Sequence, residues 1–500
     1  MESLQMLMIG FSRILNPVTL IYVIAGGIMG VIFGALPGLG SAAGCALLLP
    51  LTFRMDPTTA IVTLCALYYG NMFGGAISAV LINIPGDSPA VMTALDGYPL
   101  TKKGLAGKAL FICFAASAIG GFLGAVIITV MGEALANIGL AFGPPEITML
   151  VLLAMMSIGW ALGESPEKGL ISTFFGLLLA SIGQDIVTGS PRMTFGSMNL
   201  YGGLSFIPVV IGLFGFSQIL LTITSKEGQK VFSEKIKLKE SLPSKSDWKL
   251  ILPTSLRSSF FGFFVGLLPG SGATMAASLS YLTEQRIAKN KDEMGKGAVN
   301  GLTAAEAANN AASIGAMAPL LSLGIPGSST AAILLGGLMM WGLQPGPLFM
   351  SQNPEFSWGL IASMYVGDLL IGLICILSIP ILVHILRIPL DILTPIVICV
   401  SVVGAYSVNQ NIFDVYLMAA SGFIGYFMLK YNYPLAPMVL TLVLGSTFES
   451  SIRQALLISS GSASIFFTRP ISLGLFIGAV ALVAIPATWS AMSKRRSQTQ

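Results

Sequence analysis

The chain has 500 residues, of which 54% are hydrophobic and 10% charged, and its formal net charge at pH 7 is +4. Soluble domains carry about 25% charged residues, so this composition excludes an ordinary soluble protein. We expect an all-α polytopic protein of the lipid bilayer, with about 10 to 13 membrane-embedded segments and no sizeable soluble domain. The small positive charge sits in loops, where it indicates membrane topology and predicts no nucleic-acid partner.

The first apolar stretch contains an unusual glycine and proline pattern that recurs in the second half of the chain. Proline and three nearby glycines cannot continue a regular helix, so the pattern predicts a helix break in each half. Broken helices at matching places in two halves point to a transport site. The pattern, Gly-x-x-x-Gly-x-x-Pro-Gly-x-Gly, occupies Gly30, Gly34, Pro37, Gly38 and Gly40, and again Gly262, Gly266, Pro269, Gly270 and Gly272.

Each half has a second break further along the chain. Asn83–Ser88 and Gly324–Ser329 each carry Ile-Pro-Gly inside an otherwise apolar run. Proline removes a backbone donor and clashes with the preceding turn, so each motif predicts a second interrupted helix. The prolines and glycines of these motifs are Pro85, Gly86, Pro326 and Gly327.

The most polar segment, Ser225–Lys249, carries seven lysines and divides the chain. Basic residues are enriched in cytoplasmic loops, so we assign this segment to the cytoplasm. We therefore predict a first membrane repeat over residues 1–224, a cytoplasmic linker over 225–249, a second membrane repeat over 250–492 and a cytoplasmic tail over 493–500.

The loops after the breaks differ between the halves in their basic residues. After the first break, the second half has four basic residues over 286–296, where the first half has only a short turn at Arg54–Pro57. After the second break, the first half has three lysines over 102–108, and the second half has no basic residue until Arg387. Equivalent loops on opposite faces of the membrane predict inverted-topology repeats. The alternative is two parallel copies with incidental loop charges.

The segments around the first break are short for a membrane crossing. Ser258–Leu268 and Ala273–Gln285 lie between two arginines that we assign to the cytoplasm, which favours a re-entrant hairpin over two spans. Val18–Leu36 and Ser41–Leu51 would form the opposed hairpin in the first half. Each half is therefore expected to hold one re-entrant hairpin and one broken helix.

The breaks expose backbone groups that can bind ions. Half-helix N-termini offer partial positive charge to an anion, and small hydroxyls beside exposed amides suit a carboxylate. Freed carbonyls at the hairpin tips offer a place for Na⁺. For the spaced glycines at 30, 34, 262 and 266 we favour the alternative, close helix packing. The predicted substrate-binding residues at the breaks are Gly38, Gly40, Ser41, Ser88, Gly270, Gly272, Thr274, Ser328 and Ser329.

Intramembrane charge provides candidates for coupling to an ion gradient. Glu306 is followed by no charged residue for 48 positions, and an ionisable group at or within the membrane is a functional candidate. Asn309 and Asn310 lie near its helical face, and we add them to the substrate-binding set. Asp87 and Asp368 are the other coupling-ion candidates. The alternatives are that Glu306 pairs with Lys296 or caps a helix, and that Asp87 only binds loop amides.

Several stretches together resemble the large membrane subunit of tripartite tricarboxylate transporters, the TctA family. The resemblance covers nearly the whole chain and is densest over 26–100 and 262–350. One departure is Gly301–Glu306, where relatives often have proline just before the glutamate. The stretches are Gly30–Gly40, Asp56–Ala60, Tyr69–Gly75, Asn83–Gly86, Glu306–Ala311, Pro319–Gly327 and Gly342–Leu348.

The resemblance implies secondary active uptake of carboxylates such as citrate, driven by Na⁺ or H⁺, in a bacterial inner membrane. It also implies a small four-helix membrane subunit, TctB-like, and a periplasmic solute-binding protein, TctC-like, that delivers substrate. No cofactor is expected beyond a possible Na⁺. We expect the two hairpin tips and two broken helices to enclose one carboxylate and to move elevator-like against the remaining helices. The alternatives are a stand-alone carboxylate carrier and an anion channel; a membrane enzyme is not expected, because the sequence carries no catalytic motif.

Overall fold

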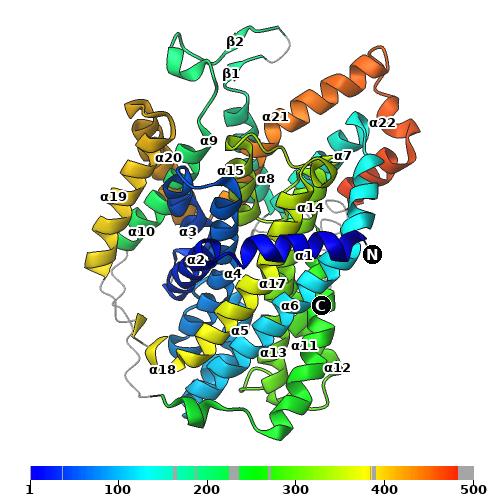
Figure 1. The fold of residues 1–500 in the computed structure, drawn as a ribbon. Coiled ribbons are helices and arrows are strands. Elements are labelled where there is room, and N and C mark those ends of the chain that lie inside the picture. Colours follow the sequence, from blue (N-terminus) through cyan, green and yellow to red (C-terminus); the bar gives the residue numbers. More distant parts are fainter. Residues whose placement is uncertain are drawn as a thin grey trace, which may run out of the picture.

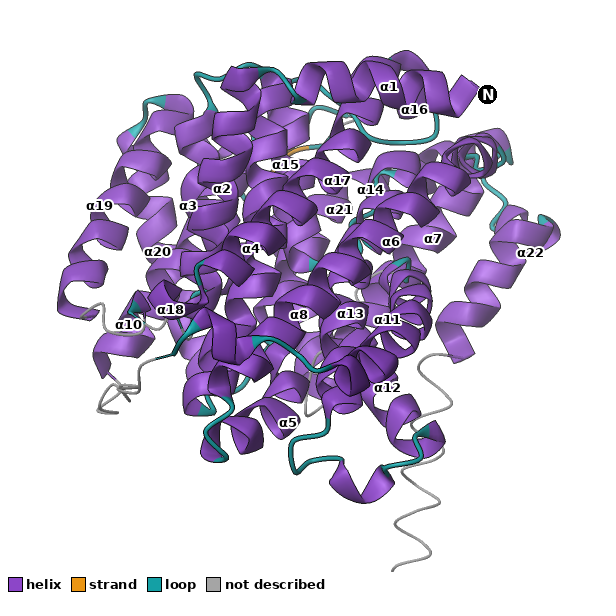
Figure 2. Cartoon of the chain, turned by 60° about the horizontal axis from the view of Figure 1, so that its bottom comes forward, coloured by secondary structure: helices purple, strands orange, loops and turns teal. Residues whose placement is uncertain are grey.

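The computed structural model describes residues 2–36, 38–161, 166–185, 188–224, 236–268, 272–382, 384–385 and 390–481. The predicted site residues Pro37, Pro269 and Gly270 lie outside these ranges, as do the tail 493–500 and the linker up to residue 235. The described chain is an assembly of packed helices with one short strand pair (Figures 1 and 2). The expected all-α polytopic membrane fold is confirmed.

The helices of the first half are α1 (Glu2–Ile14), α2 (Pro17–Ala35), α3 (Gly40–Leu48), η1 (Leu49–Thr52), α4 (Pro57–Ile82), α5 (Ala90–Lys102), α6 (Ala106–Leu140), α7 (Pro144–Ala161) and α8 (Pro166–Ala180). Strands β1 (Gly183–Gln184) and β2 (Pro191–Arg192) pair antiparallel, with Gly183 opposite Arg192. Then follow η2 (Met198–Leu200), α9 (Phe206–Val210), the π-helical turn η3 (Ile211–Phe216) and α10 (Ser217–Thr224).

The second half contains η4 (Leu238–Ser241), α11 (Lys245–Gly266), α12 (Gly272–Ile287), η5 (Lys291–Glu293), α13 (Val299–Gly315), α14 (Met317–Leu323), α15 (Ser329–Met340), α16 (Phe349–Gln352), α17 (Pro354–Leu377), α18 (Ile379–Leu382), α19 (Leu390–Asn409), α20 (Ile412–Lys430), α21 (Leu435–Ile458) and α22 (Ile465–Thr468). Within the described residues, seven helices are long and apolar enough to cross a membrane, and six shorter apolar helices accompany them. The predicted total of embedded segments stays a prediction.

Both predicted breaks interrupt the helices in both halves. Asn83 ends α4 at φ 58° and Gly324 ends α14 at φ 69°, so each Ile-Pro-Gly motif follows a residue in the left-handed conformation. Gly40 and Gly272 begin α3 and α12, each at φ 57°. Glycine adopts this backbone conformation without the steric cost that a side chain adds. The repeated sequence pattern therefore produces a repeated backbone path.

The spaced glycines serve close helix packing. A Cβ on Gly30 or Gly34 would lie 2.1 or 2.3 Å from a carbonyl oxygen of α4, and one on Gly262 or Gly266 would lie 2.4 Å from a carbonyl oxygen of α13. Only glycine lets the two backbones approach this closely. These close contacts agree with the packing role favoured for the four glycines, and they recur at matching places in α2–α4 and α11–α13.

The second half departs from the predicted hairpin in the length of its first arm. Helix α11 begins at Lys245, inside the predicted linker, and not at Ser258, because Ser244 and Asp247 form a capping box at its start. Arg257 lies midway along this helix, where its guanidinium bonds to Glu284 of α12 at 2.8 Å. Because Glu284 pairs with its charge, Arg257 does not have to lie at the membrane surface. The position of Arg257 therefore did not mark the end of the helix.

Loops from the two halves meet at one end of the molecule. The Lys103 ammonium donates to the carbonyl oxygen of Lys296 at 2.6 Å, and Lys108 pairs with Asp247 at 2.8 Å. The lysine-bearing loop after the second break of the first half thus lies beside the basic loop after the first break of the second half. The predicted inverted repeats and their boundaries stay a prediction, and these contacts are what opposite orientations require. The β1–β2 pair lies at the other end (Figure 1).

Candidate functional site

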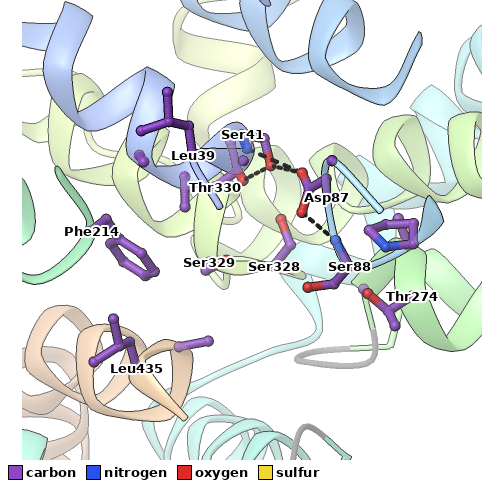
Figure 3. A pocket seen from close by; sticks show the side chains of 18 of the residues that line it. Leu39, Ser41, Asp87, Ser88, Phe214, Thr274, Ser328, Ser329, Thr330 and Leu435 are labelled. Carbon is purple, nitrogen blue, oxygen red and sulfur yellow. Dashed lines mark hydrogen bonds between the residues drawn. The ribbon is translucent and has the colours of Figure 1, made fainter. Parts of the chain in front are cut away.

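A cavity of about 530 Å³ lies where the breaks of both halves meet. One wall comes from four short segments at the breaks: 38–43, 85–89, 272–274 and 328–330. The opposite wall comes from Phe214 and Gln218 of the helix 206–224, and from the turn between α20 and α21. Figure 3 shows Ser41, Asp87 and Thr330 on one side of the cavity and Phe214 and Leu435 across it.

Asp87 is the most heavily bonded polar side chain of this wall. Its Oδ2 accepts hydrogen bonds from the backbone N–H of Ser41 at 3.1 Å and from the Ser41 hydroxyl at 3.0 Å. Its Oδ1 accepts from the backbone N–H of Ser88 at 2.7 Å. Leu39, at the N-cap position of α3, provides no side-chain acceptor, so Asp87 caps α3 from the second break. The first hairpin and the first broken helix are thereby joined by a charged group.

Hydroxyl groups join the two halves across the cavity wall. The Ser41 and Thr330 hydroxyls lie 2.9 Å apart, and the Tyr68 hydroxyl lies 3.2 Å from that of Ser328. Ser328 also caps α15, because its hydroxyl accepts from the backbone N–H of Ala331 at 3.1 Å. Each half therefore contributes a hydroxyl and a helix start to a single polar surface.

The helix ends give this surface its electrostatic character. Four helices, α3, α5, α12 and α15, begin at or beside the cavity wall. A helix N-terminus carries about half a positive charge on its unpaired N–H groups and favours an anion. Asp87 is the one charged side chain among the described residues that line the cavity. The arrangement suits a carboxylate bound by amides and hydroxyls, with Asp87 beside it as a partner for a cation.

At Gly38 the two walls of the cavity come close together. Gly38 adopts φ +91°, and a Cβ there would lie 2.2 Å from the side-chain nitrogen of Gln218. Sequence reasoning missed Gln218, Phe214, Tyr68 and Thr330. Gln218 could have been found from the sequence, because it is a lone side-chain amide in the apolar run before Thr222. Phe214 lies in a π-helical turn, a feature often found at functional sites. The residue types of this segment do not predict such a turn.

Of the eleven predicted substrate-binding residues, eight line the cavity, two lie elsewhere, and Gly270 is outside the described residues. The eight that line the cavity were all predicted from the helix breaks: Gly38, Gly40, Ser41, Ser88, Gly272, Thr274, Ser328 and Ser329. Asn309 and Asn310 do not border it. The Asn310 amide donates to the carbonyl oxygen of Glu306 at 3.2 Å, and the side-chain oxygens of both asparagines lack a partner.

Glu306 lies buried between helices, away from the cavity wall. Its carboxylate accepts hydrogen bonds from the hydroxyls of Thr93 on α5 and Ser117 on α6, the latter at 2.8 Å. It therefore ties α13 to two helices of the first half, and the alternative of pairing with Lys296 is wrong. The small alanines on either side leave space for this close approach, which the sequence alone does not reveal.

Asp368 is also buried outside the cavity. It lies on α17 against α6, where a Cβ added to Gly121 would fall 2.1 Å from its Oδ1. Its Oδ2 has no hydrogen-bond partner. Asp87 is thus the one coupling-ion candidate that the fold brings to the cavity. Within the described residues, no group of three or more His, Cys, Asp or Glu side chains gathers to hold a metal ion.

Comparison with known proteins gives one family and two relatives. Residues 20–440 match the model of the "Tripartite tricarboxylate transporter TctA family". An "Uncharacterized 52.8 kDa protein in TAR-I ttuC' 3'region" of Agrobacterium vitis is 36% identical over 496 residues, which cover 99% of this chain and 98% of that protein. An "Uncharacterized protein in TAR-II ttuC' 3'region" of the same organism is 39% identical over 229 residues, covering 45% of this chain and 95% of that protein. No solved structure matches the chain.

Proposed function

The chain belongs to the tripartite tricarboxylate transporter TctA family and is a multi-pass transporter subunit rather than an enzyme; from this premise we propose that it imports a citrate-like carboxylate by Na⁺ or H⁺ symport. It works in a bacterial inner membrane with a TctB-like four-helix subunit and a TctC-like periplasmic binding protein. The observation that carries the proposal is the meeting of two helix breaks from each half around one polar cavity.

Anion recognition in this cavity rests on dipoles and hydroxyls. The described lining residues include no lysine or arginine, while the starts of α3, α12 and α15 and the hydroxyls of Ser41, Ser328 and Thr330 face one space. Backbone N–H groups at a helix start bind carboxylates without a cationic side chain. A site of this kind binds a carboxylate firmly enough to load it and releases it without breaking a strong ion pair.

Coupling to an ion gradient is assigned to Asp87. Its carboxylate borders the cavity and lies within hydrogen-bond distance of the Ser41 hydroxyl, itself 2.9 Å from that of Thr330. Carboxylate and hydroxyl oxygens together suit Na⁺, and a proton on Asp87 would serve the same purpose. Either cation offsets the charge that Asp87 places beside an anionic substrate. When no cation is bound, the Asp87 carboxylate repels the anionic substrate. The binding of the cation and the binding of the substrate are therefore linked.

Movement of the break-bearing helices against the rest of the protein provides alternating access. The far wall of the cavity is formed by η3 and the start of α10, by the end of α20 and by the start of α21. The linker lysines that follow α10, together with Lys430 at the end of α20, support a cytoplasmic location for this part of the molecule. We therefore assign this conformation to the cytoplasm-facing part of the transport cycle.

Uptake of labelled citrate into proteoliposomes tests the proposal. The chain is reconstituted with its two partner proteins, and a Na⁺ or a pH gradient is imposed in turn. Symport predicts saturable accumulation above equilibrium with one of the gradients, whereas a channel only equilibrates citrate and a stand-alone carrier needs no partners. No accumulation of any di- or tricarboxylate with either gradient would refute the proposal.

An aspartate pair separates coupling from helix capping. Asp87→Asn should abolish accumulation driven by the ion gradient and retain citrate exchange between the two sides. Asp56 caps α4 through the N–H groups of Thr58 and Thr59 at 3.1 and 3.2 Å, outside the cavity, so Asp56→Asn is the matched control. If both variants keep gradient-driven accumulation, the coupling role of Asp87 is wrong.

A further inference from the structure

A second cavity, of about 480 Å³, lies at the end of the molecule opposite the lysine-rich loops. It is covered by the β1–β2 segment and lined below by the ends of α8 and α15 and the middle of α21. The helices α15 and α21 also border the central cavity, at Ser329 and Leu435. The two cavities therefore follow each other along the same helices. From Leu435 to Ser446 of α21, the helical rise separates them by roughly 16 Å.

Four charged side chains fasten the β1–β2 segment to α21. Arg192 on β2 donates through both Nη atoms to Glu449 on α21, at 2.8 and 3.1 Å. Arg453, one turn further along α21, donates to Asp185 at 3.0 and 2.6 Å and pairs with Glu449 at 2.7 Å. Arg192 and Glu449 line the second cavity directly. A guanidinium thus lines the cavity at the end of the molecule opposite the lysine-rich loops.

The Nε donor of Arg192 is unused. Glu449 occupies the end of the guanidinium that carries Nη1 and Nη2, while Nε is buried and has no hydrogen-bond partner. A buried donor without an acceptor is costly, and natural structures rarely keep one without a reason. A guanidinium has a second, side-on edge that includes Nε and binds a carboxylate with two parallel hydrogen bonds. A carboxylate in the cavity would complete this edge.

We propose that the second cavity is an extracytoplasmic carboxylate site, in which Arg192 receives the substrate before it passes along α21 to the central cavity. The proposal rests on the proposed carboxylate transport. Glu449 holds the Nη1 and Nη2 end of the guanidinium, so a carboxylate at the Nε edge would lie beside it, and repulsion between the two negative charges would loosen the fastening of the β1–β2 segment. Gln184, Tyr201 and Ser446 add neutral polar groups to the wall. The site thereby selects for a carboxylate without holding it permanently.

Two charge-neutralising variants give opposite results if Arg192 binds substrate. Arg192→Gln removes the guanidinium and should raise the KM for citrate uptake by about tenfold or more. Glu449→Gln removes the repelling charge and should lower the KM. A merely structural ion pair predicts that both variants shift the KM in the same direction, because both break the same contact. That result would overturn the proposal.

Arg469→Gln is the matched control. Arg469 pairs with Glu146 at 2.6 Å outside both cavities, so its loss should leave the KM unchanged. Arg192→Lys, which keeps the charge and lacks Nε, should show a KM between those of the wild type and Arg192→Gln. A shift in Arg469→Gln as large as that in Arg192→Gln would also contradict the proposal, because it would show that any lost arginine has this effect.

Hydrogen exchange of residues 188–204 gives a readout that does not depend on transport. In the full-length protein in detergent, citrate should change the exchange of this segment in the wild type and in Asp87→Asn, and should not in Arg192→Gln. If transport fails while this change persists, the proposed function is wrong and the second site stands. If transport is intact and citrate changes exchange equally in Arg192→Gln, the second site is wrong. Succinate and malonate, tested alongside, show whether the response is particular to a tricarboxylate.

Discussion

The close glycine contacts of α2 with α4 and of α11 with α13 predict that added side chains there lower the free energy of unfolding. Alanine at Gly34 would place its Cβ 2.3 Å from the carbonyl oxygen of Asn71 and 2.9 Å from the backbone nitrogen of Gly75. Alanine at Gly266 would meet the carbonyl oxygen of Ala312 at 2.4 Å. Both neighbours are backbone atoms of a packed helix and cannot rotate away, so the two helices must separate.

The magnitude follows from two opposing effects. Overpacking of a tight contact costs about 1–3 kcal/mol. Alanine in a helix interior gains about 1 kcal/mol over glycine, because it restricts the unfolded backbone. At Gly359 of α17 only the second effect operates, since the nearest atom to a Cβ there is 3.9 Å away. Gly34→Ala and Gly266→Ala should therefore each fall about 1–3 kcal/mol below Gly359→Ala in free energy of unfolding.

Unfolding of the purified protein in mixed micelles, titrated with SDS, measures these differences. The matched positions in the two halves should give similar losses, and Gly359→Ala should be at least as stable as the wild type. If Gly34→Ala and Gly266→Ala match Gly359→Ala, the close approach of the helix backbones is wrong. If only one of the two is destabilised, the equivalence of the two halves is wrong.

Three further predictions concern other contacts. Glu306→Gln keeps an oxygen that accepts from one of the Thr93 and Ser117 hydroxyls and gains an NH2 that can donate to the other, so gradient-driven citrate uptake should be retained. Loss of accumulation in that assay would return Glu306 to the coupling role. Burial opposes ionisation of Asp247, but hydrogen bonds from Lys108 and Ser244 outweigh this effect and hold the pKa of Asp247 below its usual value. The Lys108–Asp247 contact should therefore stabilise the folded protein above pH about 4. This stabilisation should be lost as the pH falls through the lowered pKa of the folded state. Melting curves of the wild type and Asp247→Asn should accordingly converge toward acid pH, and a constant gap would contradict this. A Cβ added at Gly38 would lie 3.6 Å from Gln218 Cγ, so a Gly38→Cys/Gln218→Cys pair in a Cys399→Ser background should form a disulfide. The disulfide should stop uptake, and a reductant should restore it. Uptake unchanged by a formed disulfide would argue against relative movement of the two walls.

The sequence predicts one side of the central cavity well. Glycine and proline act on the backbone of their own segment, so the breaks at Gly38–Gly40 and Pro85–Gly86 and their counterparts could be located from local chemistry. The opposite wall depends on which helices pack against those breaks. Phe214 and Leu435 are ordinary apolar residues, and only the tertiary arrangement gives them a place in the cavity.

The predictions about charge depended on the partner of each group. Asp87 was expected near a break and lies at the cavity, because the break itself holds it there. Glu306 was expected to be a coupling-ion candidate at or within the membrane, yet hydroxyls on two other helices bind it, and those hydroxyls lie about 190 and 210 positions away in the chain. Arg257 was taken as a boundary because its carboxylate partner on α12 could not be inferred from its own surroundings.

The glycine contacts also set how the molecule can move. In each half, the glycine of the second break approaches the hairpin itself: a Cβ on Gly86 would lie 1.8 Å from the carbonyl oxygen of Gly34, and one on Gly327 would lie 3.0 Å from that of Gly266. The end of the first hairpin arm and the second break of each half are thus in direct contact. Because this contact holds the hairpin arm against the broken helix, we expect the two elements to move together and not separately.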